Sequence, residues 1–188
     1  MDIYQLISQR QSDRAFSPQR IEREVLDRIA GAALLSPSAC NSQPWHLIVV
    51  DDEEKCAQVS ETLTSIGMNT WASQAAAHII IVEECPNFTA RVGGWLKNKH
   101  FPHIDCGILA ANITLAATHE GVGSCIVGWF NEKHLKKVLD IPSRKRVLLD
   151  IVLGYSTQSH RNKSRKPRSE VLSHPTLFCS IGLEGCGL

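Results

Sequence analysis

The sequence predicts a layered domain of the α+β or α/β class, in which helices and strands mix along the chain. Two short apolar runs, 45–50 and 78–82, have the β-branched composition of buried strands, and a helix-like segment separates them. Two more strands are expected at about 125–129 and 146–153, again with a helix between them. Elements mixed in this way pack as layers around a shared core. The chain has 188 residues, 43 % of them hydrophobic, which is enough to bury such a core as one domain.

Helical periodicity accounts for most of the remaining chain. Apolar residues recur every four positions over 21–33, which predicts a helix that ends near residue 34. A longer helix is expected over 105–120, and its apolar residues surround most of its circumference. Such a helix is typically buried or lies at a subunit interface. The segment 88–103 predicts an irregular helix, interrupted at Gly93-Gly94.

Charge and composition exclude several classes of function. The formal net charge is +1, which argues against general binding to nucleic acids or to anionic membranes. No apolar run approaches the length of a membrane span, and the first residues show no basic stretch followed by an apolar block. We therefore expect a cytoplasmic protein. The seven cysteines are scattered and odd in number, which predicts reduced thiols rather than a disulfide framework.

Three polar segments are candidate binding sites. The loop Ser36–Trp45 lies between a predicted helix and a predicted strand, and its side chains could hold a flat polar ligand, although most such loops are only connections. Two arginines bracket a serine in Arg10–Arg14, and His160–Arg168 is densely basic. Each basic segment is either a solvated loop or an anion site. If the fold brings all three together, they suit a phosphorylated flat cofactor better than a metal or a nucleic acid.

Motifs of other chemistries are missing or incomplete. The sequence contains no Gly-x-Gly-x-x-Gly after a strand, no phosphate-binding loop and no Gly-x-Ser-x-Gly elbow. Nothing distinguishes one cysteine as a nucleophile. The spacing His100-x-x-His103-x-x-Cys106 could suit a metal, but a structural zinc site needs a fourth ligand. We therefore expect no metal.

Four motifs in order, spanning roughly Met1 to Val171, resemble the nitroreductase family of homodimeric FMN-dependent oxidoreductases. Arg10–Phe16 is similar to the family's Arg-x-Ser-x-Arg/Lys-x-Phe, and Ser36–Trp45 to its Ser-Pro-Ser-x-x-Asn-x-Gln-Pro-Trp. The segment Asp105–Gly128 resembles its long helix, Gly-x-Gly turn and Gly-containing strand. Lys163–Val171 resembles its C-terminal Lys-x-Arg-x-Pro…Glu-Val.

The resemblance implies a three-layer α/β/α sandwich with a mostly antiparallel sheet, in a domain-swapped homodimer with FMN sites at its interface. It divides the chain into an FMN-binding domain, 1–172, and a C-terminal tail, 173–188, of unknown role. The implied activity is ping-pong hydride transfer, in which NADH or NADPH reduces nitroaromatics, quinones or related small acceptors. Alternatives are a divergent flavin reaction (desaturation, dehalogenation or flavin destruction) and a non-enzymatic flavin-binding protein.

The resemblance also implies roles for individual residues. Four would hold the FMN phosphate: Arg10, Ser12, Lys163 and Arg165. Arg14 would reach the pyrimidine edge of the flavin ring, and Asn69 would bond its polar edge. The backbone N–H groups of Val127 and Gly128 would lie near the flavin N5. Flavin chemistry needs no protein nucleophile, so no catalytic side chain is expected.

The polar loop would line the flavin from the same subunit or from the partner. Its expected contacts are Ser38, Ala39, Cys40 and Asn41, and Gln11 joins them from the first motif. Cys40 would either touch the flavin or fill space beside it. Many family members carry an acidic residue where this chain has Val127, which implies a different polarity on the substrate side.

Overall fold

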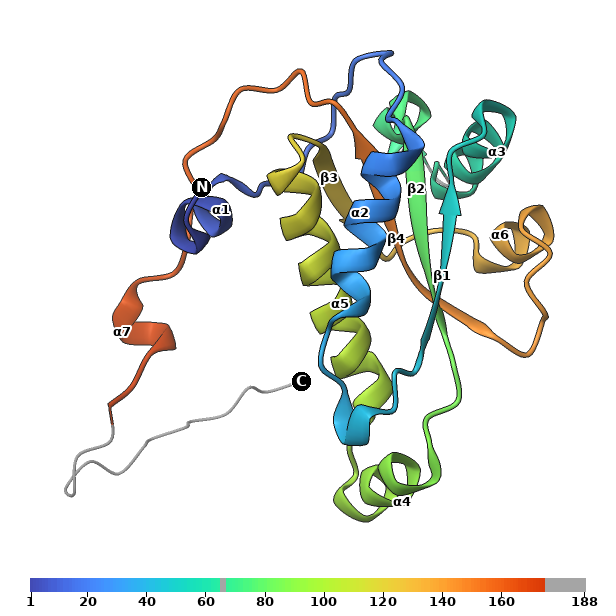
Figure 1. Cartoon of the computed structure of the whole chain (residues 1–188), viewed down its shortest axis with the longest axis vertical. Helices are drawn as coiled ribbons and strands as arrows, with labels where there is room; N and C mark the ends of the chain where they lie inside the picture. The colour runs from blue at the N-terminus through green and yellow to red at the C-terminus, as the bar shows by residue number, and fades with distance from the viewer. Residues whose placement is uncertain (65–66, 175–188) are drawn as a thin grey trace.

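The computed structural model describes residues 1–64 and 67–174 as three layers, with helices on both faces of an antiparallel sheet (Figure 1). The strands follow the order β1-β2-β4-β3 across the sheet, and every neighbouring pair is antiparallel. Their bounds are Trp45–Val50 (β1), Ala77–Glu83 (β2), Gly123–Val127 (β3) and Arg146–Gly154 (β4). The α+β class is therefore confirmed, and the alternative α/β class is wrong because it requires parallel strands.

Two layers of helices cover the sheet. The helices are α1 (Ile3–Gln9), α2 (Arg23–Leu34), α3 (Glu53–Leu63), α4 (Phe88–Lys97), α5 (Phe101–His119), α6 (Glu132–Val138) and α7 (Arg168–Val171), with short 3-10 turns η1 (Ala39–Asn41) and η3 (Thr70–Gln74). Helices α2 and α5 pack on one face of the sheet, whereas α3 and α6 pack on the other. Helix α7 lies apart from the sheet in Figure 1.

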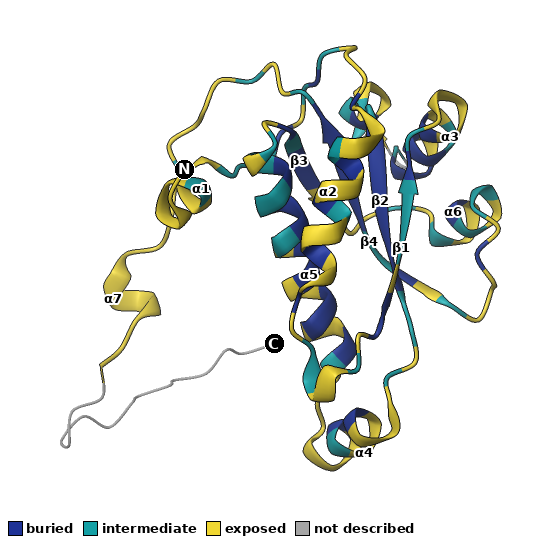
Figure 2. Ribbon diagram, viewed as in Figure 1, coloured by how far each residue is buried: buried dark blue, intermediate teal, exposed yellow. Residues whose placement is uncertain are grey.

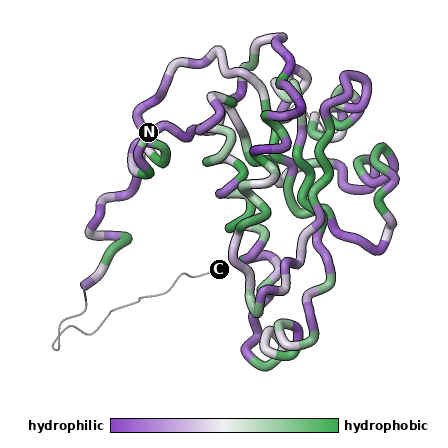
Figure 3. Tube along the Cα trace, viewed as in Figure 1, coloured by the Kyte–Doolittle hydropathy of each residue, from purple (hydrophilic) through white to green (hydrophobic). Residues whose placement is uncertain are grey.

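Strand β2 lies inside the sheet and has a core on each side. Ile79 and Ile81 pack toward α2 and α5, and Ile80 and Val82 pack toward α3 and α6. Successive side chains of a strand point to opposite faces, so an unbroken apolar run is needed where both faces are covered. Figure 2 shows this burial along the sheet, and Figure 3 shows the matching hydrophobic runs in the strands and α5.

The region before α5 differs from its prediction. Helix α4 runs through Gly93 and Gly94 without a break, so the expected interruption is wrong. A Cβ at Gly94 would lie only 2.7 Å from the carbonyl oxygen of Lys99, so the glycine permits the tight connection into α5. Helix α5 begins at Phe101, earlier than predicted, because Pro102 is well suited to a first helical turn.

The described cysteines are free thiols, as predicted, and the described helices include none with the length and apolar character to cross a bilayer. Burial raises the pKa of the Cys56 and Cys106 thiols to about 12, which makes both poor nucleophiles at neutral pH. Cys179, Cys186 and most of the proposed tail lie outside the described residues.

A chain of buried polar side chains links α3, β2 and β4. His78 Nδ1 lies 2.9 Å from Asp150 Oδ2, and His78 Nε2 lies 3.1 Å from Ser60 Oγ. Ser60 Oγ also donates to the carbonyl oxygen of Ala72 at 2.8 Å. Hydrolase triads use the same three residue types, but all three are fully buried here, which denies access to a substrate. Their role is therefore structural.

Replacement of Asp150 tests this role. We expect Asp150→Ala to lower the free energy of unfolding by about 3–5 kcal/mol, because it leaves a buried polar partner without its counterpart. Urea denaturation at fixed protein concentration measures the change. The control Asp27→Ala, on the exposed side of α2, should shift stability by no more than about 0.5 kcal/mol. A loss below about 1 kcal/mol for Asp150→Ala would contradict the structural role.

Candidate functional site

The first basic segment is held against the edge of the sheet. Ser12 forms a parallel bridge with Ser124 of β3, and the Asp13 N–H donates to the Ser124 carbonyl oxygen at 2.9 Å. The Asp13 carboxylate is buried and accepts from Ser156 Oγ at 2.7 Å. Phe16 is buried against Gly154. Backbone pairing, one buried carboxylate and one aromatic ring therefore fix the course of residues 10–16.

The second basic segment returns alongside the first. The Arg161 guanidinium donates to the Ser12 carbonyl oxygen at 2.6 Å, and the Arg161 N–H donates to Gln11 Oε1 at 3.1 Å. Lys163 Nζ donates to the carbonyl oxygens of Ile7 and Ser8, at the C-terminal end of α1, where a cation is favourable. The structure thus brings the two basic segments together, although some 150 residues separate them along the chain.

These contacts enclose a polar pocket of about 340 Å³. Its lining consists of Arg10, Gln11, Ser12, Arg14, Arg161, Asn162, Lys163, Ser164 and Arg165. Five of these side chains are cationic, and no carboxylate from the described part of the chain lines the pocket. Partial burial lowers the pKa of the Lys163 ammonium, and the positive charges of Arg10 and Arg165 lower it further. Such crowding of like charges suits an anion with several oxygens.

The polar loop has an unusual backbone. Cys40, Asn41 and Gln43 all have φ between +47° and +53°, the left-handed region that residues with a side chain seldom adopt. Ser38 Oγ accepts from the Gln43 N–H at 2.9 Å, which closes the loop on itself. The Ala39 N–H donates to Asp105 Oδ2 at 3.1 Å. The loop is therefore preformed, and the N-terminal part of α5 anchors it.

The loop and the basic pocket lie at opposite ends of α5. The loop is bonded to Asp105 near the start of the helix, whereas the pocket adjoins Ser124, a few residues beyond its end. The helix rises about 21 Å from Asp105 to its last residue, His119, which is too great a distance for one pocket in one chain. Of the two alternatives left open by the sequence, a loop and a basic pocket that meet within the same chain do not fit this geometry. The alternative, in which a partner supplies the loop, is compatible with this geometry.

The remaining predicted residues lie near the end of β3. Asn69 Nδ2 is within 3.4 Å of the Trp129 carbonyl oxygen, so Asn69 adjoins the turn at Gly128. Gly128 is exposed, but the Val127 side chain is buried in the core under α3 and α6. The expectation that Val127 alters polarity on the substrate side is therefore wrong. Only its backbone can face a ligand, and β3 leads from the basic pocket to this turn over about 13 Å.

Three pocket residues were not singled out from the sequence: Arg161, Asn162 and Ser164. All three belong to the basic run 160–168, so the composition indicated this segment as a candidate anion site but did not predict which of its residues line the pocket. Arg161 is the most informative, because it joins the two segments through the carbonyl oxygen of Ser12. The direction of its side chain depends on a tertiary contact that no local pattern encodes.

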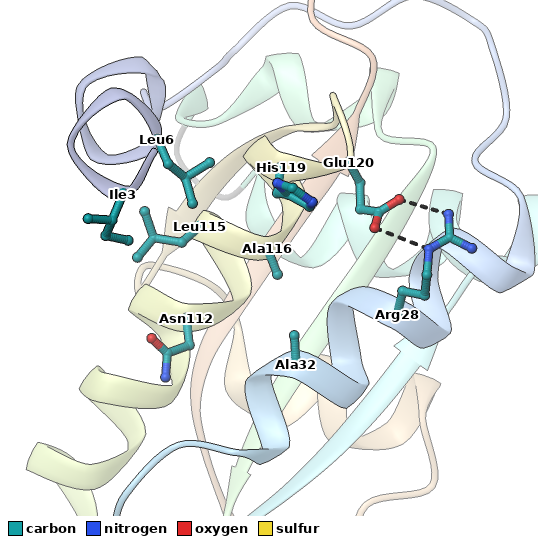
Figure 4. Close-up of a pocket in the computed structure, with 9 residues that line it drawn as sticks. All are labelled: Ile3, Leu6, Arg28, Ala32, Asn112, Leu115, Ala116, His119 and Glu120. Atoms are coloured by element: carbon teal, nitrogen blue, oxygen red, sulfur yellow. Dashed lines mark hydrogen bonds and ion pairs between the residues drawn. The ribbon is translucent and has the colours of Figure 1, made fainter. Parts of the chain in front are cut away.

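A second hollow lies between α1, α2 and α5 (Figure 4). Ile3 and Leu6 point into it from α1, and Leu115 and Ala116 face it from α5. At its rim, Arg28 donates to both carboxylate oxygens of Glu120 at 3.1 and 2.7 Å. The hollow contains none of the predicted site residues, and its cation is already paired, so it is a poorer anion site than the basic pocket.

Gly154 provides a test of how the first segment is held. A Cβ at this position would lie 2.7–2.9 Å from three Phe16 atoms, so Gly154→Ala must displace the ring. We expect a loss of about 1–3 kcal/mol in the free energy of unfolding, measured by urea denaturation. The control Gly31→Ala, on α2 with nothing within 4 Å, should be neutral or stabilising by up to about 1 kcal/mol. Equal stability of the two variants would contradict the packing role of Gly154.

Comparison with known proteins gives a consistent result. The model of the nitroreductase family matches residues 7–84 and 69–155. A relative from Archaeoglobus fulgidus, provisionally named an NADH dehydrogenase/NAD(P)H nitroreductase, is 33 % identical over 154 residues, which cover 80 % of this chain and 83 % of the relative. The FMN reductase (NAD(P)H) of Bacillus subtilis is 25 % identical, over 94 % of this chain and 74 % of the reductase.

A solved structure agrees with these relatives. The FMN-dependent nitroreductase of Clostridium difficile superposes with a TM-score of 0.73 and 28 % identity, over 93 % of this chain and 100 % of that one. The chain therefore belongs to the nitroreductase family.

Proposed function

We propose that the protein is an FMN-dependent oxidoreductase that uses NADH or NADPH to reduce nitroaromatic, quinone or related acceptors. The observation that carries this proposal is the convergence of two basic segments on one pocket in a chain of the nitroreductase family. Relatives named FMN reductase (NAD(P)H) and oxygen-insensitive NADPH nitroreductase support the choice of cofactor and electron donor. A cytoplasmic location, where NADH and NADPH are supplied, is part of the proposal.

The basic pocket fits the phosphate of FMN. A phosphate carries up to two negative charges and several acceptor oxygens, and charge-assisted donors bind it most strongly. Arg10, Lys163 and Arg165 supply the charge, and Ser12 adds a hydroxyl group. Burial lowers the pKa of Lys163 most, and the charges of Arg10 and Arg165 lower it further; an anion in the pocket would offset this repulsion. Residues 1–172, which contain all of these groups, form the proposed FMN-binding domain.

The groups beyond the phosphate pocket suit the flavin ring. When bound, FMN supplies a ring that accepts a hydride from the nicotinamide and passes electrons to the acceptor. The Arg14 cation would stabilise negative charge at the pyrimidine edge, and Asn69 would bond a polar edge. The backbone at Val127 and Gly128 would donate toward the ring. Gly128 carries no side chain that could block a substrate.

A homodimer would complete the site. The pocket and the polar loop are too far apart within one chain, so a two-fold dimer would place the loop of one subunit beside the pocket of the other. Large apolar side chains also remain exposed on α5, on the end of α2 and beyond β3: Ile104, Ile108, Leu34, Leu35 and Trp129. Leu35 is 86 % exposed, and such surfaces are typical of interfaces. The detached α7 suits a domain-swapped arm.

Removal of two pocket cations tests the phosphate site. We expect Arg10→Ala/Arg165→Ala to weaken FMN binding by at least about 100-fold, because each lost charge-assisted bond is worth about 1.5–3 kcal/mol. Quenching of FMN fluorescence on titration with flavin-free protein measures the affinity. The control Lys133→Ala/Arg144→Ala removes two exposed cations near α6 and should bind FMN normally.

Two results would reject parts of the proposal. Normal flavin affinity in the Arg10→Ala/Arg165→Ala variant would exclude the phosphate assignment. If the wild-type protein binds FMN but oxidises neither NADH nor NADPH across a panel of nitroaromatic and quinone acceptors, the oxidoreductase assignment fails, and a non-enzymatic flavin-binding protein becomes the better explanation.

Subunit complementation tests the shared site. The pocket variant Arg10→Ala/Arg165→Ala and a loop variant, Asn41→Ala/Ser38→Ala, should each bind FMN poorly when homodimeric. After the two are mixed, unfolded and refolded together, heterodimers should recover FMN binding, because one of their sites receives the intact pocket and the intact loop. Titration of the mixture with FMN measures the recovery. The control is the same mixture prepared without exchange of subunits.

If each site came from a single chain, every site in the heterodimer would carry one lesion. The mixture would then bind no better than its components. Absence of recovery, together with normal dimerisation of the mixed chains by light scattering, would therefore contradict the shared site.

A further inference from the structure

Three side chains with metal-binding atoms converge where β2 ends and α5 begins. His100 Nε2 lies 3.5 Å from Glu83 Oε1, and His103 Nε2 lies 3.6 Å from Glu83 Oε2. The ligand atoms of all three residues lie within 4.8 Å of one another. This cluster is near α4 in Figure 1, at the end of the sheet away from the proposed FMN phosphate pocket.

We propose that Glu83, His100 and His103 form a binding site for a divalent transition-metal ion, with zinc as the best fit. Tetrahedral zinc has bonds of about 2.0–2.2 Å to histidine nitrogen and carboxylate oxygen, which places its ligand atoms about 3.3–3.6 Å apart. The observed N–O distances match this spacing and exceed the usual hydrogen-bond length of about 2.7–3.2 Å. Three protein ligands leave one position for water or another small ligand.

The donor set selects the class of ion. Two imidazoles and one carboxylate suit zinc, copper, nickel or iron, whereas calcium and magnesium prefer sites made wholly of oxygen atoms. The histidine side chains are 58 % and 55 % exposed, so an ion can reach them from solvent. Glu83 is mostly buried, with a side chain that is 16 % exposed, and its strand fixes its position.

The backbone positions the two imidazoles beside each other. His100 is the N-cap residue of α5, and His103 follows in the first turn, a spacing that places side chains on one face of a helix. Their ring centroids are 3.8 Å apart. Glu83 is the last residue of β2 and meets them across the connection that contains α4. The two imidazoles and the carboxylate are therefore close enough for one ion to lie among them.

The site differs from the motif in the sequence. His100-x-x-His103-x-x-Cys106 offered Cys106 as the third ligand, but Cys106 is buried, and its Sγ lies 3.7 Å from the Pro44 carbonyl oxygen. Glu83 takes its place from a different element. The expectation of no metal considered only ligands that are close in sequence, and β2 supplies the ligand that this search omitted.

A bound ion would restrain the segment between β2 and α5, which contains α4. The ligands close a loop from Glu83 to His100, and closure of a flexible loop by a metal stabilises the folded state. Asn87, inside this loop, donates through its N–H to Ser42 Oγ at 2.8 Å and through Nδ2 to the Cys40 carbonyl oxygen at 3.0 Å. The ion would therefore stabilise the segment whose Asn87 is hydrogen-bonded to the polar loop. The proposal does not depend on the proposed oxidoreductase function.

Zinc binding to the full-length, flavin-loaded protein after treatment with a chelator tests the site. Calorimetric titration with Zn²⁺ should show about one ion per chain. Glu83→Gln and His103→Gln should each weaken this binding by at least about 10-fold, since each removes a ligand. The matched control is His119→Gln, which removes an exposed histidine at the far end of α5 and should leave the affinity unchanged. An unchanged far-UV circular dichroism spectrum in every variant shows that the fold is retained.

Co²⁺ identifies the ligand atoms. Its absorption spectrum should show nitrogen and oxygen ligation without a thiolate charge-transfer band, and the exposed Cys85 should be replaceable by serine without loss of binding. The proposal is overturned if the wild-type protein does not bind Zn²⁺ at millimolar concentration, or if Glu83→Gln and His103→Gln bind as tightly as wild type. Loss of binding in Cys85→Ser alone would likewise overturn it, because it would assign the ion to a thiolate.

Discussion

The pairing of residues 10–16 with the edge of the sheet is the constraint on which the candidate site depends. The cations of the basic pocket repel one another, so an unsupported loop would separate them. Burial lowers the pKa of Lys163, and the positive charges of Arg10 and Arg165 lower it further. The Ser12–Ser124 bridge, the buried Asp13 carboxylate and the packing of Phe16 on Gly154 oppose this separation. The fold thereby holds a positively charged pocket ready for an anion, and anion binding then relieves the repulsion.

Helix α5 sets the second constraint, which is distance. It holds the polar loop through Asp105 near its start and leads to β3 beyond its last turn, so its length separates the two halves of the proposed FMN site. A two-fold axis beside α5 would form two equivalent sites, because each subunit would contribute its pocket to one site and its loop to the other. The exposed Ile104 and Ile108 on the same helix agree with an axis in this position.

Local patterns in the sequence predicted most of the elements. The strand 45–50 coincides with β1, and the run 78–82 lies inside β2, because β-branched apolar runs favour strands. Their burial differs, since β2 is buried almost throughout, whereas the edge strand β1 is buried only at its two ends. The two basic segments were also visible, since charge is a property of composition. The expected break at Gly93-Gly94 is wrong because the close approach of the Lys99 carbonyl oxygen, in the turn just after α4, favours a glycine at position 94 without ending the helix there.

Long-range contacts were beyond the reach of these patterns. The sequence could not place the polar loop at the opposite end of α5, nor show that the Val127 side chain points into the core. It also could not bring Glu83 to the histidines of α5, because the residues that separate them form a helix of their own. The face on which a side chain is buried, and the residues that it contacts, depend on how the layers pack. Periodicity indicates only whether a segment has an apolar face.

The proposed metal site and the proposed flavin site are connected through the polar loop. Asn87 joins the loop to the segment that the ion would close, and Asp105 joins it to the helix that carries His100 and His103. The loop of one subunit would face the flavin held by the pocket of the other. An ion bound to one chain would therefore stabilise the wall of a site whose cofactor is held by its partner, and its effect on catalysis would depend on how much that wall moves when the acceptor binds.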